Sequence, residues 1–222
     1  MNGPHLPARL DDDDIIYLSE EELEIVDGLP TNESVRQSVI SLAGSTEERV
    51  KDVLIYMVDH GGDGVFKLDE QTLLYAEDLK LWLDELHQSY DGKSTVIYDA
   101  CESGSFVPLL AANDGSQRMV ITSSAAKQPA VFALNGYTSF PYFFWSSFYV
   151  GFNISDSQIL AKQAMNLIWG QDPKFDANGD GLANTKSDKV SIEEFSFGQR
   201  AAKASDNPTV GEIQLDIELN GE

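Results

Sequence analysis

Three short apolar runs constrain the fold of this chain more than any other feature of its sequence. They are residues 53–58, 94–98 and 119–122, and each predicts a strand buried on both faces of a sheet. Segments with the apolar spacing of helices lie between and after them, at 31–42, 76–86, 139–148 and 155–169. Strands that alternate with helices predict a mostly parallel central sheet covered on both faces, which is an α/β/α sandwich of three layers.

Polar residues with useful chemistry follow each of these predicted strands. The first strand is followed by His60 in a glycine-rich loop, the second by Cys101, and the third by Ser123 and Ser124. In open α/β sheets, functional sites form beyond the carboxyl ends of the strands. We therefore expect one sheet edge to bring His60 and Cys101 together, although 41 positions separate them in the sequence.

The composition is that of a folded, acidic domain. The 222 residues are 42% hydrophobic, and 37 Asp and Glu against 15 Lys and Arg give a net charge of −22. This charge argues against nucleic acid as a partner, and no apolar run reaches the roughly 18–20 residues of a membrane span. The single cysteine permits no internal disulfide and leaves the compartment open. A secreted or cell-surface location is favoured, although residues 1–9 show no signal peptide.

Cys101 and His60 fit the chemistry of a cysteine nucleophile. A thiol attacks a carbonyl as the thiolate, and a nearby imidazole can take its proton or lower its pKa. Glycines beside both residues let a substrate backbone approach closely. A lone cysteine is otherwise more often an inert core residue, and His5 and His87 are interpreted as ordinary solvated residues.

The sequence around this pair resembles a known peptidase family. Asp59-His60-Gly61 and the later block Asp-Ala-Cys-Glu-Ser-Gly-Ser at residues 99–105 are similar to the His-Gly and Glu-Ala-Cys-Glu-Ser-Gly-Ser blocks of legumain-like (C13, clan CD) cysteine peptidases. Residues 60–64 also resemble the corresponding loop of the catalytic subunit of the GPI transamidase, a member of the same family. The resemblance covers residues 15–168 and implies a caspase-like fold.

A family member of this kind is a cysteine endopeptidase that acts on a peptide or protein and needs no catalytic cofactor. The resemblance implies that Cys101 attacks the scissile carbonyl and that His60 protonates the leaving amine. It also implies an oxyanion hole formed by the backbone N–H groups of Gly61 and Cys101. A transpeptidase or transamidase, in which an amine resolves the acyl-enzyme, is one alternative. The other is a non-catalytic caspase-fold scaffold in a larger multidomain chain.

The candidate substrate pocket consists of Asp99, Ser123 and Ser124. Members specific for asparagine have Glu where this chain has Asp99, and their later acidic pocket residue has no counterpart near residues 141–142. We therefore expect a substrate side chain with a hydrogen-bond donor or a positive charge, or else a local turn role for Asp99. The family's first strand, with the Asn that orients the catalytic His, has no counterpart before Ile15.

An acidic loop near the end of the chain is a candidate metal site. Residues 176–181, Asp-Ala-Asn-Gly-Asp-Gly, match the first half of an EF-hand calcium loop, whereas the twelfth position is Ser187 in place of Glu. The predicted ligands of a structural calcium ion are Asp176, Asn178, Asp180, the Leu182 carbonyl, Asn184 and Asp188. The alternative is an Asp/Asn/Gly turn that binds no ion.

The remaining expectations concern smaller elements and domain boundaries. Residues 15–18 predict a short strand, and residues 65–68 and 72–74 predict a hairpin. We expect three regions: a caspase-like peptidase domain at 1–170, the acidic loop with a helical segment at 171–207, and a β-type tail or the start of another domain at 208–222.

Overall fold

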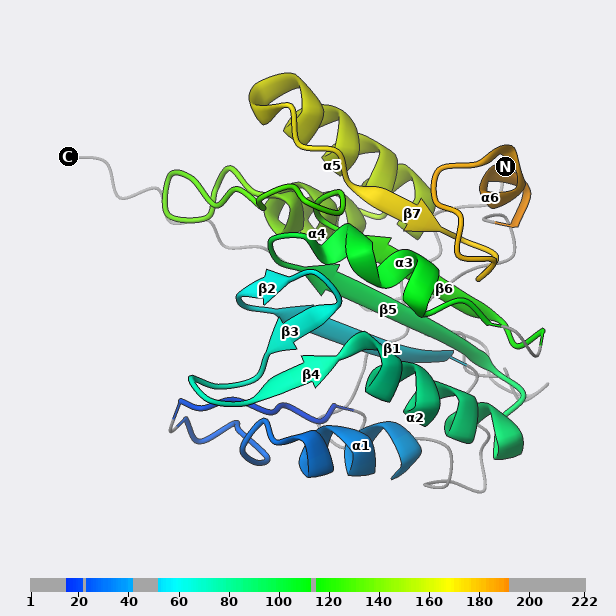
Figure 1. Ribbon diagram of the computed structural model, residues 1–222. Helices are drawn as coiled ribbons and strands as arrows, with labels where there is room; N and C mark the ends of the chain where they lie inside the picture. Colours follow the sequence, from blue (N-terminus) through cyan, green and yellow to red (C-terminus); the bar gives the residue numbers. More distant parts are fainter. Residues whose placement is uncertain (1–14, 22, 42–51, 113–114, 192–222) are drawn as a thin grey trace, which may run out of the picture.

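A four-stranded sheet forms the centre of the molecule (Figure 1). The computed structural model describes residues 15–21, 23–41, 52–112 and 115–191. The strands, in their order across the sheet, are β1 (Asp52–Val58), β5 (Lys93–Asp99), β6 (Arg118–Thr122) and β7 (Lys174–Asp176). The first three run parallel and β7 is antiparallel to β6. The predicted mostly parallel sheet is therefore confirmed.

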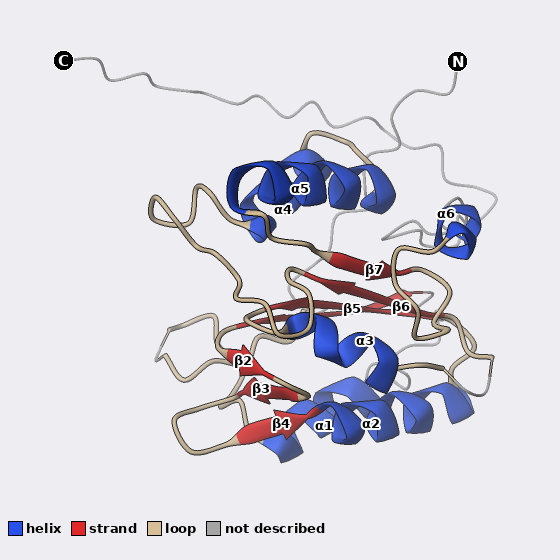
Figure 2. Cartoon of the chain, turned by 45° about the horizontal axis from the view of Figure 1, so that its top comes forward, coloured by secondary structure: helices blue, strands red, loops and turns tan. Residues whose placement is uncertain are grey.

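Helices cover both faces of this sheet (Figure 2). One layer contains α1 (Asn32–Ser41), α2 (Ala76–Ser89) and the short α3 (Phe106–Leu109), and the other contains α4 (Phe140–Tyr149) and α5 (Ile154–Trp169). Successive residues of β5 point to opposite faces, so Val96 packs in the core of the first layer and Ile97 in the core of the second. This arrangement confirms the α/β/α sandwich.

A small antiparallel sheet lies beside the carboxyl end of β1. It consists of β2 (Gly61–Gly62), β3 (Val65–Lys67) and β4 (Leu73–Tyr75). The predicted hairpin corresponds to β3 and β4, and β2 is an addition that the sequence pattern did not indicate. Because β2 pairs with β3, the glycine-rich loop after β1 is folded back into regular structure.

Two strand predictions need correction. Residues 15–18 form no strand; Leu18 makes an isolated bridge with Gly28, because the chain turns back on itself there. The strand at residues 52–58 is not buried on both faces, since Tyr56 is 40% and Val58 48% exposed. Within the part of the chain that the structure describes, β1 is an edge strand, and its outer edge has no strand partner.

The segment after β7 ends in the short helix α6 (Lys186–Ser191). The predicted tail at 208–222 lies outside the described residues, so the proposed domain boundaries stay predictions. No helix in the described ranges is long and apolar enough to cross a membrane.

Candidate active site

The pairing of β1 with β5 places His60 and Cys101 at equivalent positions. Val58 and Asp99 form the last pair of this parallel ladder, and His60 and Cys101 each follow two residues later. The loops therefore leave neighbouring strands at the same sheet edge. The Cys101 thiol is free and half-buried, whereas His60 is exposed. Neither residue is fully buried, and both lie in loops at this sheet edge.

Gly61 shows how closely these two loops approach each other. A Cβ atom at this position would lie 2.1 Å from the Tyr98 hydroxyl and 2.8 Å from the Cys101 carbonyl oxygen. The Tyr98 hydroxyl donates a hydrogen bond to the Val65 carbonyl (2.8 Å), and burial raises the pKa of Tyr98, so it remains a protonated donor. Only glycine fits here, because any side chain would push the His60 loop away from Cys101.

The residues on either side of Cys101 form a tight turn, which we call the cysteine turn (residues 100–105). Glu102 has a φ of 57°, in the left-handed region that non-glycine residues seldom adopt. Its N–H donates to the Gln128 carbonyl (2.8 Å), and its carbonyl accepts from the Ser105 N–H (2.9 Å) and hydroxyl (2.7 Å). The Ser105 hydroxyl in turn accepts from the Gly64 N–H (2.9 Å) in the loop after His60. The turn is thus held from two other loops.

Ser123 and Ser124 contact the cysteine turn, and their prediction as pocket residues stays a prediction. Both are fully buried. The Ser124 hydroxyl donates to the Ala100 carbonyl (3.0 Å) and accepts from the Ser103 N–H (3.2 Å). The Ser123 hydroxyl also points to the Ala100 carbonyl (3.5 Å). A residue type seen at a strand end predicts its place on the sheet edge but does not show which way its side chain points.

Asp99 is a buried carboxyl group with unusual surroundings. It is fully buried, and neither oxygen has a hydrogen-bond partner among the described residues. Burial raises its pKa by more than the nearby Ser123 hydroxyl lowers it. Burial raises the pKa of Asp99 to about 7. A carboxyl group without donors, two residues before Cys101, is unexplained by the fold itself.

Aromatic residues from β1 and α4 lie on the same side of the sheet as Asp99. Burial, and then the charge of Asp99, raise the pKa of Tyr56 to about 12, and the Tyr56 and Trp145 rings meet edge to face with centroids 5.4 Å apart. Trp145 also lines an open pocket of about 410 Å³. Its other lining residues are Phe132, Asn135, Gly136, Tyr137, Ser139, Pro141 and Tyr142. Sequence analysis missed this pocket, although the density of aromatic residues at 137–145 is a signal that could have indicated it.

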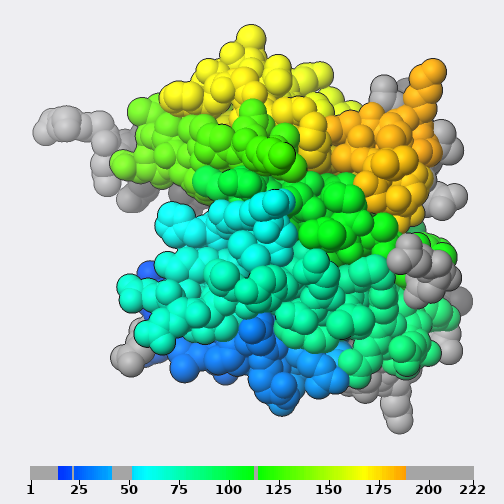
Figure 3. All heavy atoms as spheres, viewed as in Figure 1, coloured from blue at the N-terminus to red at the C-terminus, as the bar shows by residue number. Residues whose placement is uncertain are grey.

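The surface shows how these segments come together. In Figure 3 the segments around residues 60–75 (cyan), 100–110 (green) and 125–140 (yellow-green) adjoin on one face of the molecule. The three segments belong to the loops after β1, β5 and β6. The candidate site is therefore built from strand-end loops, as the parallel sheet predicts.

The acidic loop forms an internally hydrogen-bonded turn. Asp176 is buried and accepts from the N–H groups of Gly179 (2.8 Å) and Gly181 (2.7 Å), and burial raises its pKa to about 6. Asp188 accepts from the Ala177 N–H (2.8 Å) and the Thr185 N–H (2.6 Å). The described residues contain no group of three or more His, Cys, Asp or Glu side chains placed to hold a metal. Calcium binding here stays a prediction.

Comparison with known proteins identifies the family. The model of the peptidase C13 family matches residues 32–152, which include both strand-end loops and more than half of the chain. The chain belongs to the peptidase C13 family. This is a family of cysteine peptidases, so the resemblance seen in the His60 and Cys101 blocks is confirmed.

Individual relatives match shorter regions. A vacuolar-processing enzyme of Vicia sativa is 43% identical over 63 residues, which is 28% of this chain and 13% of that protein. A vacuolar-processing enzyme of Glycine max is 44% identical over 54 residues, or 24% of this chain and 11% of that protein. The matched regions thus span about an eighth of these relatives.

A solved structure supports the fold. The crystal structure of caspase-1 from Spodoptera frugiperda superposes with a TM-score of 0.51 at 11% sequence identity. The match covers 69% of this chain and 70% of that chain. At this identity the likeness concerns the fold alone, which is caspase-like.

Proposed function

We propose that this C13 family member is a cysteine endopeptidase in which Cys101 is the nucleophile and His60 the acid–base group. The observation that supports the proposal most strongly is the register of β1 and β5, because it places both residues two positions beyond the same strand pair. The contact of Gly61 with Cys101 adds to it, since the two loops touch.

The proposed reaction needs only groups of this site. The Cys101 thiolate adds to the carbonyl carbon of a peptide bond, and the N–H groups of Gly61 and Cys101 stabilise the negative oxygen that forms. The C–N bond then breaks as His60 gives a proton to the leaving amine, which leaves an acyl-enzyme. Water attacks this thioester, the thiol leaves, and the carboxylic acid product is released.

Asp99 supports a preference for substrate side chains that donate hydrogen bonds or are positively charged. Its two oxygens have no hydrogen-bond donor among the residues that the structure describes, and it lies two residues before Cys101. A donor brought by the substrate would satisfy an otherwise unpaired buried group. Replacing Asp99 with Asn should then change the preference at the residue before the cleaved bond, which a panel of peptides varied at that position would detect.

A non-catalytic scaffold is the second candidate, and one observation favours it. Among the described residues, β1, which precedes His60, has no strand partner on its outer edge, and its Tyr56 and Val58 side chains are exposed. The names of the two plant relatives support a lumenal or secreted location for either function.

Substitutions at the two reactive residues test the proposal. Cys101→Ala should abolish both peptide cleavage and covalent labelling by peptidyl electrophiles, and His60→Ala should remove most of kcat. His87→Ala is the control, because His87 hydrogen-bonds Ser94 (2.9 Å) near the amino end of β5, away from the site. Product masses with and without an added amine distinguish hydrolysis from transamidation. Cleavage that persists in Cys101→Ala would refute the assignment, and inactive wild-type protein that no electrophile labels would favour the scaffold.

A further inference from the structure

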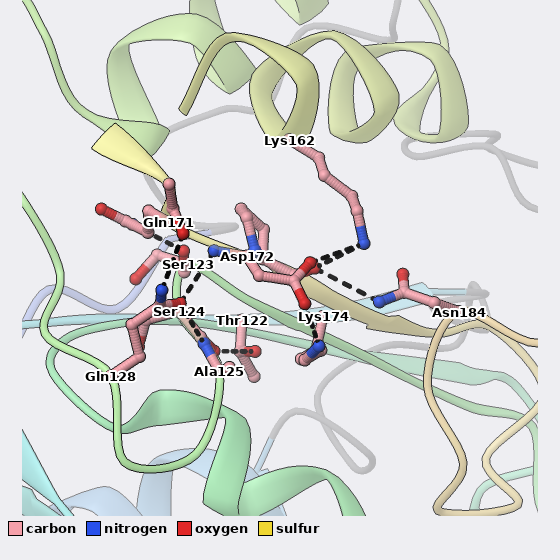
Figure 4. A network of polar contacts seen from close by, with 12 residues as sticks. Thr122, Ser123, Ser124, Ala125, Gln128, Lys162, Gln171, Asp172, Lys174 and Asn184 are labelled. Atoms are coloured by element: carbon pink, nitrogen blue, oxygen red, sulfur yellow. Dashed lines mark hydrogen bonds and ion pairs between the residues drawn. The ribbon is translucent and has the colours of Figure 1, made fainter. Parts of the chain in front are cut away.

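Two glutamines hold the loop that follows β6, residues 123–131. Gln171, which follows α5, is 2% exposed. Its side-chain nitrogen donates to the Ser123 carbonyl (2.6 Å) at one end of the loop, and its side-chain oxygen accepts from the Val131 N–H (2.9 Å) at the other. One buried amide group therefore joins both ends of the loop, as Figure 4 shows for the Ser123 contact.

Gln128 lies in this loop, and its side chain binds the backbone of the segment around Gln171. Its side-chain nitrogen donates to the Gly170 carbonyl (2.9 Å), and its side-chain oxygen accepts from the N–H groups of Asp172 (2.8 Å) and Ala125 (3.3 Å). The two glutamines thus bind each other's segments, and both amide groups use donor and acceptor (Figure 4). We call this pair the glutamine clamp (Gln128 and Gln171).

The segment that anchors the clamp is itself fixed by charge. The Asp172 carboxylate forms an ion pair with Lys162 of α5 (2.9 Å) and another with Lys174 of β7. Lys162 also donates to the Pro173 carbonyl (3.2 Å). Figure 4 shows both lysines directed at Asp172. The 170–172 segment is therefore tied to α5 and β7.

The clamp reaches the cysteine turn through one backbone bond. The Gln128 carbonyl accepts the hydrogen bond from the Glu102 N–H (2.8 Å), next to Cys101. Glu102 is in the left-handed conformation, which is strained for a non-glycine residue and persists only where surrounding contacts enforce it. The bond from Gln128 is one of these contacts. Neither glutamine side chain contacts Cys101 or His60 in any hydrogen bond of the described residues.

We infer that Gln128 and Gln171 are positioning residues, which hold the cysteine turn so that the thiol and the Cys101 N–H face the reacting carbonyl. The inference rests on the proposed peptidase function for its catalytic consequence. A loop that drifts when the clamp is broken would release Glu102 N–H from its acceptor, and the turn would relax. A displacement of 1 Å at reacting groups can cost about 100-fold in rate.

The test compares substitutions at three glutamines. Gln128→Ala and Gln171→Leu each remove one side of the clamp. Gln128→Ala is the less disruptive to folding of the two, because Gln128 is only half-buried. Gln158→Leu is the matched control: Gln158 of α5 is also 2% exposed, and its side-chain nitrogen has no partner among the described residues. Each protein is examined by amide hydrogen exchange at Glu102, by kcat and KM for a peptide substrate, and by thermal melting.

We expect both clamp variants to exchange the Glu102 amide at least about 10-fold faster than wild type, because local opening becomes easier. We also expect kcat to fall at least about 10-fold with KM nearly unchanged, since a misplaced nucleophile affects the reaction step more than binding. Gln158→Leu should change neither quantity. Gln128→Glu, which keeps the acceptor and loses the donor to Gly170, should lie between wild type and Gln128→Ala.

Unchanged exchange of the Glu102 amide in Gln128→Ala would overturn the inference, whatever the activity. So would an equal loss of kcat in Gln158→Leu, since the effect would then follow from general destabilisation. If wild-type protein shows no turnover that depends on Cys101, the proposed function fails, while the exchange measurement still decides whether the clamp holds the turn.

Discussion

Replacing Asp99 with Asn should stabilise the protein increasingly as the pH rises, because the folded state resists ionisation of this carboxyl group. Burial raises its pKa from an ordinary value of 3.8 to about 7 in the folded protein. Below pH 3.8 the group is neutral in the folded and unfolded states, and the wild type loses nothing. Between pH 3.8 and 7 the unfolded state ionises first, so wild-type stability falls, and the loss levels off above pH 7. Asn is neutral throughout and does not suffer this loss.

The size of the effect follows from the interval between the two pKa values. At about 1.4 kcal/mol per pH unit, the interval from 3.8 to about 7 corresponds to about 4 kcal/mol of unfolding free energy at pH 8. The same relation gives about 2 kcal/mol at pH 5 and about 3 kcal/mol at pH 6. The raised pKa of Asp176 acts equally in both proteins and cancels from the difference.

Urea unfolding of the two proteins at pH 5, 6, 7 and 8 measures this difference directly. Both proteins should contain Cys101→Ala, so that thiol oxidation and self-cleavage do not contribute. The Asn amide also lacks partners, which adds an offset that does not vary with pH. A difference that stays constant from pH 5 to 8 would refute the reasoning, because the folded protein would then hold Asp99 ionised with a donor or cation beside it.

Three other perturbations have definite expected results. Gly61→Ala should destabilise the protein by about 1–3 kcal/mol through overpacking and should also abolish turnover; a variant that melts and cleaves as wild type does would contradict the contact of the two loops. Arg118→Met should cost about 1–3 kcal/mol in urea unfolding, because the buried guanidinium donates to the Leu110 carbonyl (2.9 Å) and pairs with Asp84 (2.8 Å), and a loss below about 0.5 kcal/mol would show these contacts to be unimportant. Millimolar calcium should raise the melting temperature of wild type but not of Asp176→Ala/Asp180→Ala, and an unchanged wild-type curve would leave the acidic loop as a turn without an ion.

The fold was predictable because its signals are local. Apolar runs of four to six residues and helical spacing between and after them occur within single elements, so β1, β5, β6 and the four longer helices could be placed from their own residues. The strand β7 and the short helix α3 carry no such pattern and were not predicted. The parallel order then follows from alternation, and the meeting of His60 with Cys101 follows from parallel order. The edge position of β1 could not be predicted, because exposure of Tyr56 depends on which strand lies beside it.

The features that sequence reasoning missed depend on loops that fold against distant segments. The aromatic pocket requires the 132–142 loop, in which Leu134 and Asn135 adopt positive φ angles that no turn motif in the sequence indicated. The orientation of Ser124 toward the Ala100 carbonyl depends on contacts across 24 positions. Gln128 and Gln171 look like ordinary polar residues in the sequence, and their bonds to each other's segments join positions 40 or more residues apart.

The two halves of the proposed dyad are held to different degrees. The cysteine turn is hydrogen-bonded to Ser124, to Gln128 and, through Ser105, to Gly64, and a strand lies on each side of β5. His60 is exposed, and its hydrogen bonds among the described residues use its backbone groups: its carbonyl accepts from the Lys67 N–H (3.0 Å), and its N–H donates to the Asp59 carboxylate (2.5 Å). Catalysis requires the imidazole to face the thiol, whereas a scaffold does not. The choice between peptidase and scaffold therefore depends on the orientation of His60, which is the less constrained of the two residues.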